Sequence, residues 1–257
     1  MLNLIFFNIV GTLMSIYSGL SGSCLADYAQ SAIQQADEFR EQGKTQEAIK
    51  LYNQAQIFFE KQRDYLGLMH ALSGRLISWQ HLYNHKQEEI YALYAKKEAE
   101  YMQKISKKQG FYDLDHLIHF FMGKSCILLK EYPKAESEFT EALKNYPRDD
   151  AEKGDWTAHL GEAIYKNGKK KEGIQTILNG ISQINKHRSE CDSFKYGVWT
   201  SGAYLRIAKI LIQDQNIDQA KFYLSKGEEI IQRNPKLVIR KQQLESLKEQ
   251  IENSYKS

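Results

Sequence analysis

Apolar residues recur every three to four positions along most of the chain, which is the spacing of amphipathic helices. No segment alternates apolar and polar residues convincingly as a half-buried strand does, so the pattern predicts an all-α fold. The three prolines, Pro133, Pro147 and Pro235, each lie at a predicted helix start or just past a predicted helix end, where a missing N–H costs little.

Small residues occupy regular places in residues 116–149. Counting from residue 116, Gly123, Ala135 and Ala142 fall at the eighth, twentieth and twenty-seventh positions, and Phe139 falls at the twenty-fourth. The small residues let two helices approach closely, and the aromatic ring fills the space between neighbouring pairs. This spacing predicts an antiparallel helix pair.

In these positions the segment resembles the tetratricopeptide repeat, a 34-residue pair of antiparallel helices. A repeat of this kind cannot bury its apolar face alone, so neighbouring repeats are expected. Residues 29–62, 154–187 and 201–234 match the same pattern in phase.

Two glycines replace the usual alanines in residues 154–187, at Gly173 and Gly180, and Gly161 stands at the eighth position as Gly123 does. They preserve close helix contact, but each weakens its own helix by about 1 kcal/mol.

Two further stretches complete the predicted architecture. Residues 63–115 fit the repeat poorly but keep an apolar helical stripe, so we interpret them as a degenerate helix pair with a long second helix. Residues 236–254 carry one apolar stripe with a polar back, as expected of a capping helix. The prediction is a right-handed α-solenoid of about five helix pairs over residues 24–257.

The N-terminal residues 1–23 contain no charged side chain and are rich in Leu, Ile and Phe. A soluble solenoid has no use for such a segment, so we predict a signal peptide or membrane anchor. Three fates fit it. The segment resembles a bacterial lipoprotein signal with Cys24 as the lipidated residue, although Ser21 stands where that family usually has Leu. Cleavage near Ser23 or Ala26 and retention as an uncleaved membrane helix also fit.

The resemblance implies a binding surface. In tetratricopeptide domains the first helices of successive repeats line a concave groove that holds a helix or extended segment of a partner protein. The corresponding groove positions in this chain are Ile33, Asp37, Arg40, Glu41, Leu117, Phe120, Lys124, Ile127, Glu162, Tyr165, Lys166, Leu205, Lys209 and Gln213.

Catalytic and cofactor signals are weak. The segment Asp113–His119 contains two aspartates and two histidines, which makes a metal-dependent enzyme the alternative reading, but His119 takes a packing position of the repeat. Asp149, Asp150, Glu152 and Asp155 are interpreted as a solvated acidic loop, because their spacing lacks the glycine turn of a calcium loop. No phosphate-binding loop or nucleophile motif is present, so no cofactor is predicted.

Net charge adds little. A value of +3 is nearly balanced and gives no support for nucleic-acid binding. The sequence therefore predicts a non-catalytic, exported and membrane-tethered adaptor that binds a protein partner, and a homo-oligomerising structural module remains a further alternative. It leaves the partner and the oligomeric state open.

Overall fold

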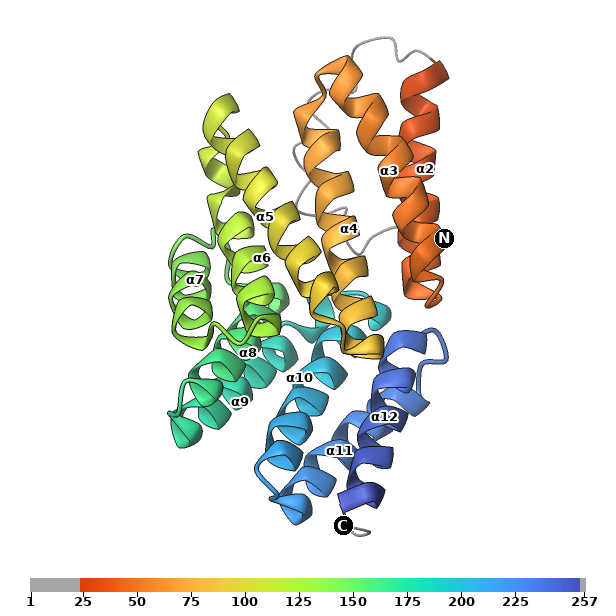
Figure 1. The fold of residues 1–257 in the computed structure, drawn as a ribbon. Helices are drawn as coiled ribbons and strands as arrows, with labels where there is room; N and C mark the ends of the chain where they lie inside the picture. The colour runs from red at the N-terminus through yellow and green to blue at the C-terminus, as the bar shows by residue number, and fades with distance from the viewer. Residues whose placement is uncertain (1–23, 255–257) are drawn as a thin grey trace. The chain divides into compact units, whose positions relative to one another are not determined.

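A computed structural model of the chain describes residues 24–254, and within them the chain is all-helical, with no strand. The chain divides into two compact units, with the boundary between Tyr112 and Asp113. The helices of each unit pack in adjacent pairs, which confirms the predicted all-α class (Figure 1). The predicted signal or anchor segment, residues 1–23, lies outside the described residues.

Unit 1 holds four described helices, and each packs against the next along the chain. Helix α4 contacts α3 on one side and α5 on the other, and α2 also contacts α4. The helices are α2 (Cys24–Glu41), α3 (Thr45–Gln62), α4 (Tyr65–Lys86) and α5 (Glu89–Gln109).

The segment that fits the repeat poorly contains the long helices α4 and α5, which pack against each other. Both helices are long, at 22 and 21 residues, whereas only the second was expected to be. Helix α4 runs through Tyr83, Asn84 and His85 to Lys86 and ends where Gln87 adopts a left-handed conformation (φ 59°).

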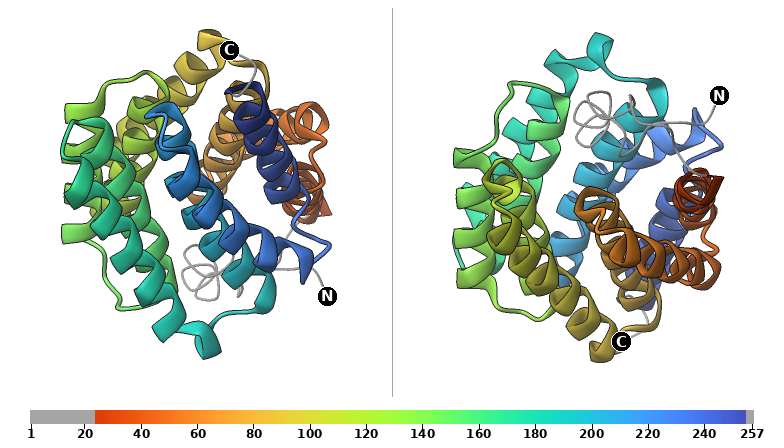
Figure 2. Two further views of the ribbon diagram at one scale, coloured as in Figure 1. Left: turned by 90° about the horizontal axis from the view of Figure 1, so that it is seen from below. Right: turned by 90° about the horizontal axis from the view of Figure 1, so that it is seen from above.

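Unit 2 begins with the short 3₁₀ turn η1 (Tyr112–Leu114), which crosses the boundary, and contains three helix pairs and a final helix. Helices α8, α10 and α12 lie next to one another, and α9 and α11 pack against them (Figure 2). The elements are α6 (Asp115–Leu128), α7 (Tyr132–Lys144), α8 (Ala151–Lys166), α9 (Lys170–Lys186), η2 (Arg188–Glu190), α10 (Ser193–Gln213), α11 (Ile217–Gln232) and α12 (Val238–Ser254).

The pair α8 and α9 is held at backbone contact by glycines. A Cβ placed on Gly161 would lie 2.7 Å from the carbonyl oxygen of Gly173, and one on Gly154 would lie 2.6 Å from that of Gly180. No real Cβ atom sits so close to a backbone oxygen, so the close contact expected at these glycines is confirmed. Gly154 was not recognised from the sequence, although it lies seven residues before Gly161 on the same helix face.

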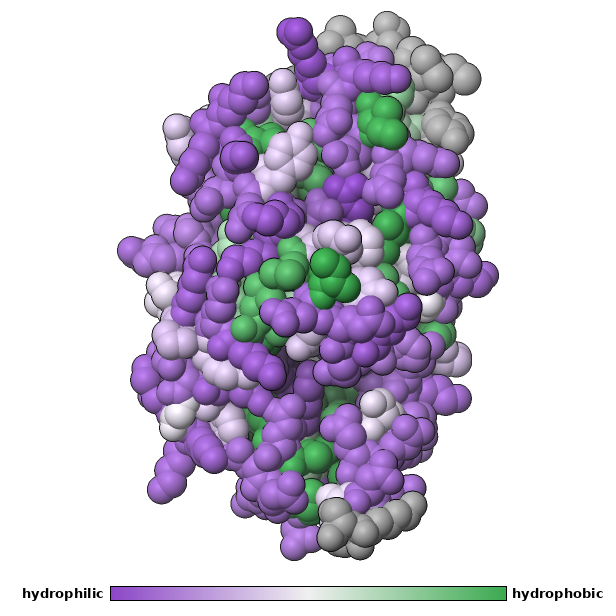
Figure 3. Space-filling view, in the orientation of Figure 1, coloured by the Kyte–Doolittle hydropathy of each residue, from purple (hydrophilic) through white to green (hydrophobic). Residues whose placement is uncertain are grey.

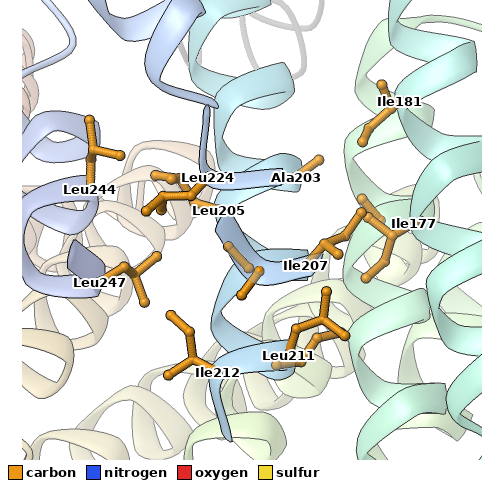
Figure 4. Packing of buried hydrophobic residues seen from close by; sticks show 14 of the residues in the cluster. Ile177, Ile181, Ala203, Leu205, Ile207, Leu211, Ile212, Leu224, Leu244 and Leu247 are labelled. Atoms are coloured by element: carbon orange, nitrogen blue, oxygen red, sulfur yellow. The ribbon is translucent and has the colours of Figure 1, made fainter. Parts of the chain in front are cut away.

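The apolar core of unit 2 is centred on α10. Figure 4 shows that its side chains point toward α9 on one side and toward α11 and α12 on the other. Ile207 and Ile210 of α10 are fully buried. Leu244 and Leu247, on the apolar side of α12, are buried in the same cluster. Helix α10 therefore packs against α8, α9, α11 and α12.

The surface visible in Figure 3 is largely hydrophilic, with separate hydrophobic areas between the charged side chains. Among the helices that the structure describes, none combines the length and the apolar character that crossing a membrane requires.

Candidate functional site

The candidate groove residues lie on the first helix of each pair. Four are on α2 in unit 1, and the others are on α6, α8 and α10 in unit 2 (Figure 1). Helices α6, α8 and α10 follow one another in space through contacts of α8 with both of its neighbours. The side of α6, α8, α10 and α12 that points away from α7, α9 and α11 is called the A-helix face of unit 2.

Burial divides the candidate residues into two sets. Seven are buried and belong to the packing of the helices: Ile33, Arg40, Leu117, Phe120, Glu162, Tyr165 and Leu205. The other seven are at least partly exposed and remain candidates for contact with a partner protein: Asp37, Glu41, Lys124, Ile127, Lys166, Lys209 and Gln213.

Arg40 shows why position alone misassigns a side chain. Its guanidinium is buried and donates from Nη1 to Asp37 Oδ1 and to the Tyr52 hydroxyl, both at 2.7 Å. Burial by itself raises the pKa of Asp37, but Arg40 and then His70 outweigh it and hold the pKa at about 2. Asp37 and Arg40 thus form an ion pair within α2, and hydrogen bonds with the Tyr52 hydroxyl join this pair to α3.

A second buried polar group lies on the A-helix face of unit 2. Asp155, His159 and Glu162 share one side of α8, and Arg206 of α10 lies against them. Arg206 donates from Nε to Glu162 Oε2 at 2.8 Å, and its Nη2 lies 2.8 Å from His159 Nε2. We call these four residues the α8–α10 polar cluster.

The pKa values in this cluster show how positive its surroundings are. Burial, followed by the charges of Arg206, Lys124 and Arg240, holds the pKa of His159 well below its usual range. The ring is therefore neutral at pH 7, where Nε2 accepts from Arg206. Burial raises the pKa of Asp155, and the same three cations partly offset that rise.

The sequence reading of Asp155 needs correction. It was assigned to a solvated acidic loop, but it lies in the second turn of α8 and is buried. Asp150 instead caps α8, since its side chain accepts from the Lys153 N–H at 3.0 Å. The signal that identifies the cluster in the sequence is the spacing of Asp155, His159 and Glu162, four and three residues apart on one helix face.

Aromatic rings lie beside the polar cluster. Phe120 of α6 stacks on Trp156 of α8 with ring centroids 4.2 Å apart and planes at 7°. Lys124 places its ammonium group 5.4 Å from the Phe120 ring centre, within the range of a cation–π contact. The face between α6 and α8 therefore combines a flat aromatic pair with positive charge.

A third group lies toward the C-terminal ends of α8 and α10. Lys166 hydrogen bonds to Gln213, a contact that joins the two helices. Burial lowers the pKa of Lys166, Glu162 opposes that effect, and Lys209 adds to it, so two ammonium groups lie close together here. The carboxylates of Glu162 and Asp214 also lie near Lys166.

The histidines of the Asp113–His119 segment do not converge. His119 Nδ1 lies 2.7 Å from Glu138 Oε2 on α7, whereas His116 packs between Tyr146 and Trp156. Burial lowers the pKa of His116. Across residues 24–254, no group of three or more His, Cys, Asp or Glu side chains is placed to hold a metal ion. Cys126 is a buried free cysteine that packs as a small apolar residue.

The chain matches no protein-family model, and no curated protein matches it significantly.

Proposed function

We propose that the chain is a non-catalytic adaptor of the tetratricopeptide type, a solenoid that holds a helix or extended segment of a partner protein on its first helices. The main support is the A-helix face of unit 2. There five accessible side chains, Lys124, Ile127, Lys166, Lys209 and Gln213, lie beside a buried aromatic pair and a largely buried polar cluster. The adjacent helix pairs and the small residues at their contacts support the solenoid.

The charge of this face favours an acidic partner segment. Five cations lie on or beside it: Lys124, Lys166, Arg206, Lys209 and Arg240. Of the carboxylates near these cations, Glu162 is already bonded to Arg206, Asp155 is buried with a raised pKa, and Asp214 is paired with Lys170. Electrostatic complementarity of this kind steers the encounter and excludes partners of the wrong charge.

Export and a membrane tether complete the proposal. Their support is the uncharged apolar sequence of residues 1–23 and the position of Cys24 after it. A lipid on Cys24 would place the adaptor at a cell envelope.

Charge reversal on the A-helix face tests the binding role. The variant Lys124→Glu/Lys209→Glu is expected to weaken partner capture about tenfold or more, because like charges then face the acidic segment. The measurement is quantitative mass spectrometry of proteins that co-purify with the full chain from its own host.

The matched control is Lys134→Glu/Lys144→Glu, which makes the same charge change on exposed positions of α7. Thermal unfolding establishes that both variants fold. Partners that the control keeps and the test variant loses support the proposal, and partners that the test variant keeps argue against it.

A further inference from the structure

The outer side of α3 and α5 in unit 1 carries large apolar side chains that the fold leaves exposed. Their exposed fractions range from 37 % for Tyr101 to 55 % for Ile57, although similar side chains on α4 are buried. The residues are Ile57 on α3 and Ile90, Leu93, Tyr94 and Tyr101 on α5. Together with the lysines described next, we call them the α3–α5 outer face.

Lysines share the same helix surfaces. On α5, Lys97, Lys104 and Lys108 follow Ile90 at intervals of seven, fourteen and eighteen residues, which returns each to nearly the same side of the helix. On α3, Lys50 and Lys61 lie seven residues before and four residues after Ile57. All five lysines are exposed.

Three nearby carboxylates are already engaged within the unit. Glu60 Oε1 accepts from the Tyr101 hydroxyl at 3.1 Å, and Glu100 pairs with Lys97 at 2.7 Å. Glu98 is turned inward to Arg75 at 2.7 Å. The α3–α5 outer face therefore presents apolar groups within an excess of positive charge.

The seam between α3 and α5 is polar and filled. Arg75 of α4 reaches between them and bonds to Asn53 and Gln56 of α3 and to Glu98 of α5. The rings of Trp79 and Tyr94 pack against each other beside it, with centroids 4.9 Å apart and planes tilted by 42°. A partner helix that binds by its apolar side needs an apolar groove, whereas here the apolar groups stand on the outer sides of two helices.

We propose that the α3–α5 outer face binds an anionic lipid surface. Tyrosines and long-chain lysines are the residues that sit at a membrane interface, with rings and methylene stems at headgroup depth and ammonium groups toward the phosphates. Tyr101 of α5 reaches Glu60 of α3, so the exposed surfaces of the two helices are neighbours. This contact is separate from the A-helix face and does not depend on the proposed adaptor role.

Vesicle co-sedimentation of the full chain tests the proposal. The probes are vesicles of phosphatidylcholine mixed with phosphatidylglycerol and vesicles of phosphatidylcholine alone. We expect tighter binding to the mixed vesicles, and we expect Lys104→Gln/Lys108→Gln to weaken it about thirtyfold, since each lysine near an anionic surface contributes about a fivefold factor. Added salt should weaken the wild-type binding in the same way.

The matched control is Lys134→Gln/Lys171→Gln, which removes the same charge from exposed positions of unit 2 and is expected to bind as the wild type does. A second variant, Ile90→Ser/Tyr94→Ser, should weaken binding without changing net charge. Equal binding to both vesicle types, or full binding by the Lys104→Gln/Lys108→Gln variant, would overturn the proposal. Binding of a soluble acidic helical peptide at this face without any affinity for vesicles would also overturn it, because a protein would then be the occupant.

Discussion

Replacing Gly161 with alanine is expected to lower the free energy of unfolding of unit 2 by about 3 kcal/mol. The new Cβ would lie 2.7 Å from the carbonyl oxygen of Gly173 and 2.7 Å from the backbone nitrogen of Ile177. Both obstacles are backbone atoms of α9, so no side-chain rotation relieves them and the two helices must move apart. Helix propensity alone predicts the opposite sign, a gain of about 1 kcal/mol.

Chemical denaturation followed by circular dichroism measures this change, and Gly227→Ala is the control. In α11 the nearest atom to a Cβ on Gly227 is the flexible Leu205 Cδ2 at 3.1 Å, and the nearest backbone atom is at 3.6 Å. The control should therefore change stability little or raise it. A Gly161→Ala protein as stable as the wild type would show that α8 and α9 are not in backbone contact.

Replacing Arg40 with methionine is expected to destabilise unit 1 by about 3 kcal/mol. The Asp37 carboxylate would lose the buried cation that compensates its charge, and the Tyr52 hydroxyl would lose a hydrogen-bond donor. Asp37 and the Tyr52 hydroxyl both lose a 2.7 Å contact with Nη1. Denaturation of Arg40→Met beside Arg233→Met, an exposed arginine of unit 2, measures the difference. A loss of stability no larger than that of the control would show that the contacts of Arg40 with Asp37 and Tyr52 do not stabilise unit 1.

Asp37 gives the same ion pair a pH signature. Its pKa is lowered from 3.8 to about 2 in the folded chain, so its stabilisation is complete above the unfolded-state pKa and is lost as the pH falls through about 2. The contribution corresponds to about 2 kcal/mol. Asp37→Asn should remove this part of the acid dependence, and an unchanged profile between pH 4 and pH 2 would argue against it.

Much of the fold could be predicted from the sequence, because a helix and its contacts leave local signals. Apolar spacing located the helix pairs, and Gly161, Gly173 and Gly180 marked a close contact that the structure shows at backbone distance. The end of α4 could not be predicted from the sequence, because Tyr83, Asn84 and His85 have the composition of a turn but lie in the helix. The helix ends where Gln87 adopts a positive φ, and a non-glycine residue gives no strong local signal for that.

The candidate site was harder to predict, because burial depends on residues far along the chain. The position of Arg40 in the repeat places it on a first helix, but Tyr52, twelve residues later, turns its side chain into the unit. The pKa of Asp155 similarly depends on the charge of Arg206, which lies on another helix pair. A repeat pattern predicts which helix a residue is on, and the packing of its neighbours decides whether a partner can reach it.

The most direct test of the adaptor proposal is site-specific photo-crosslinking of the full chain in its own host. A crosslinking residue is placed at Lys209 or Gln213 on the A-helix face, and at Thr140 on the exposed side of α7 as the control. The account predicts a discrete protein adduct from Lys209 and Gln213 that is absent from Thr140. No adduct from the A-helix face, or the same adducts from all three positions, would contradict it.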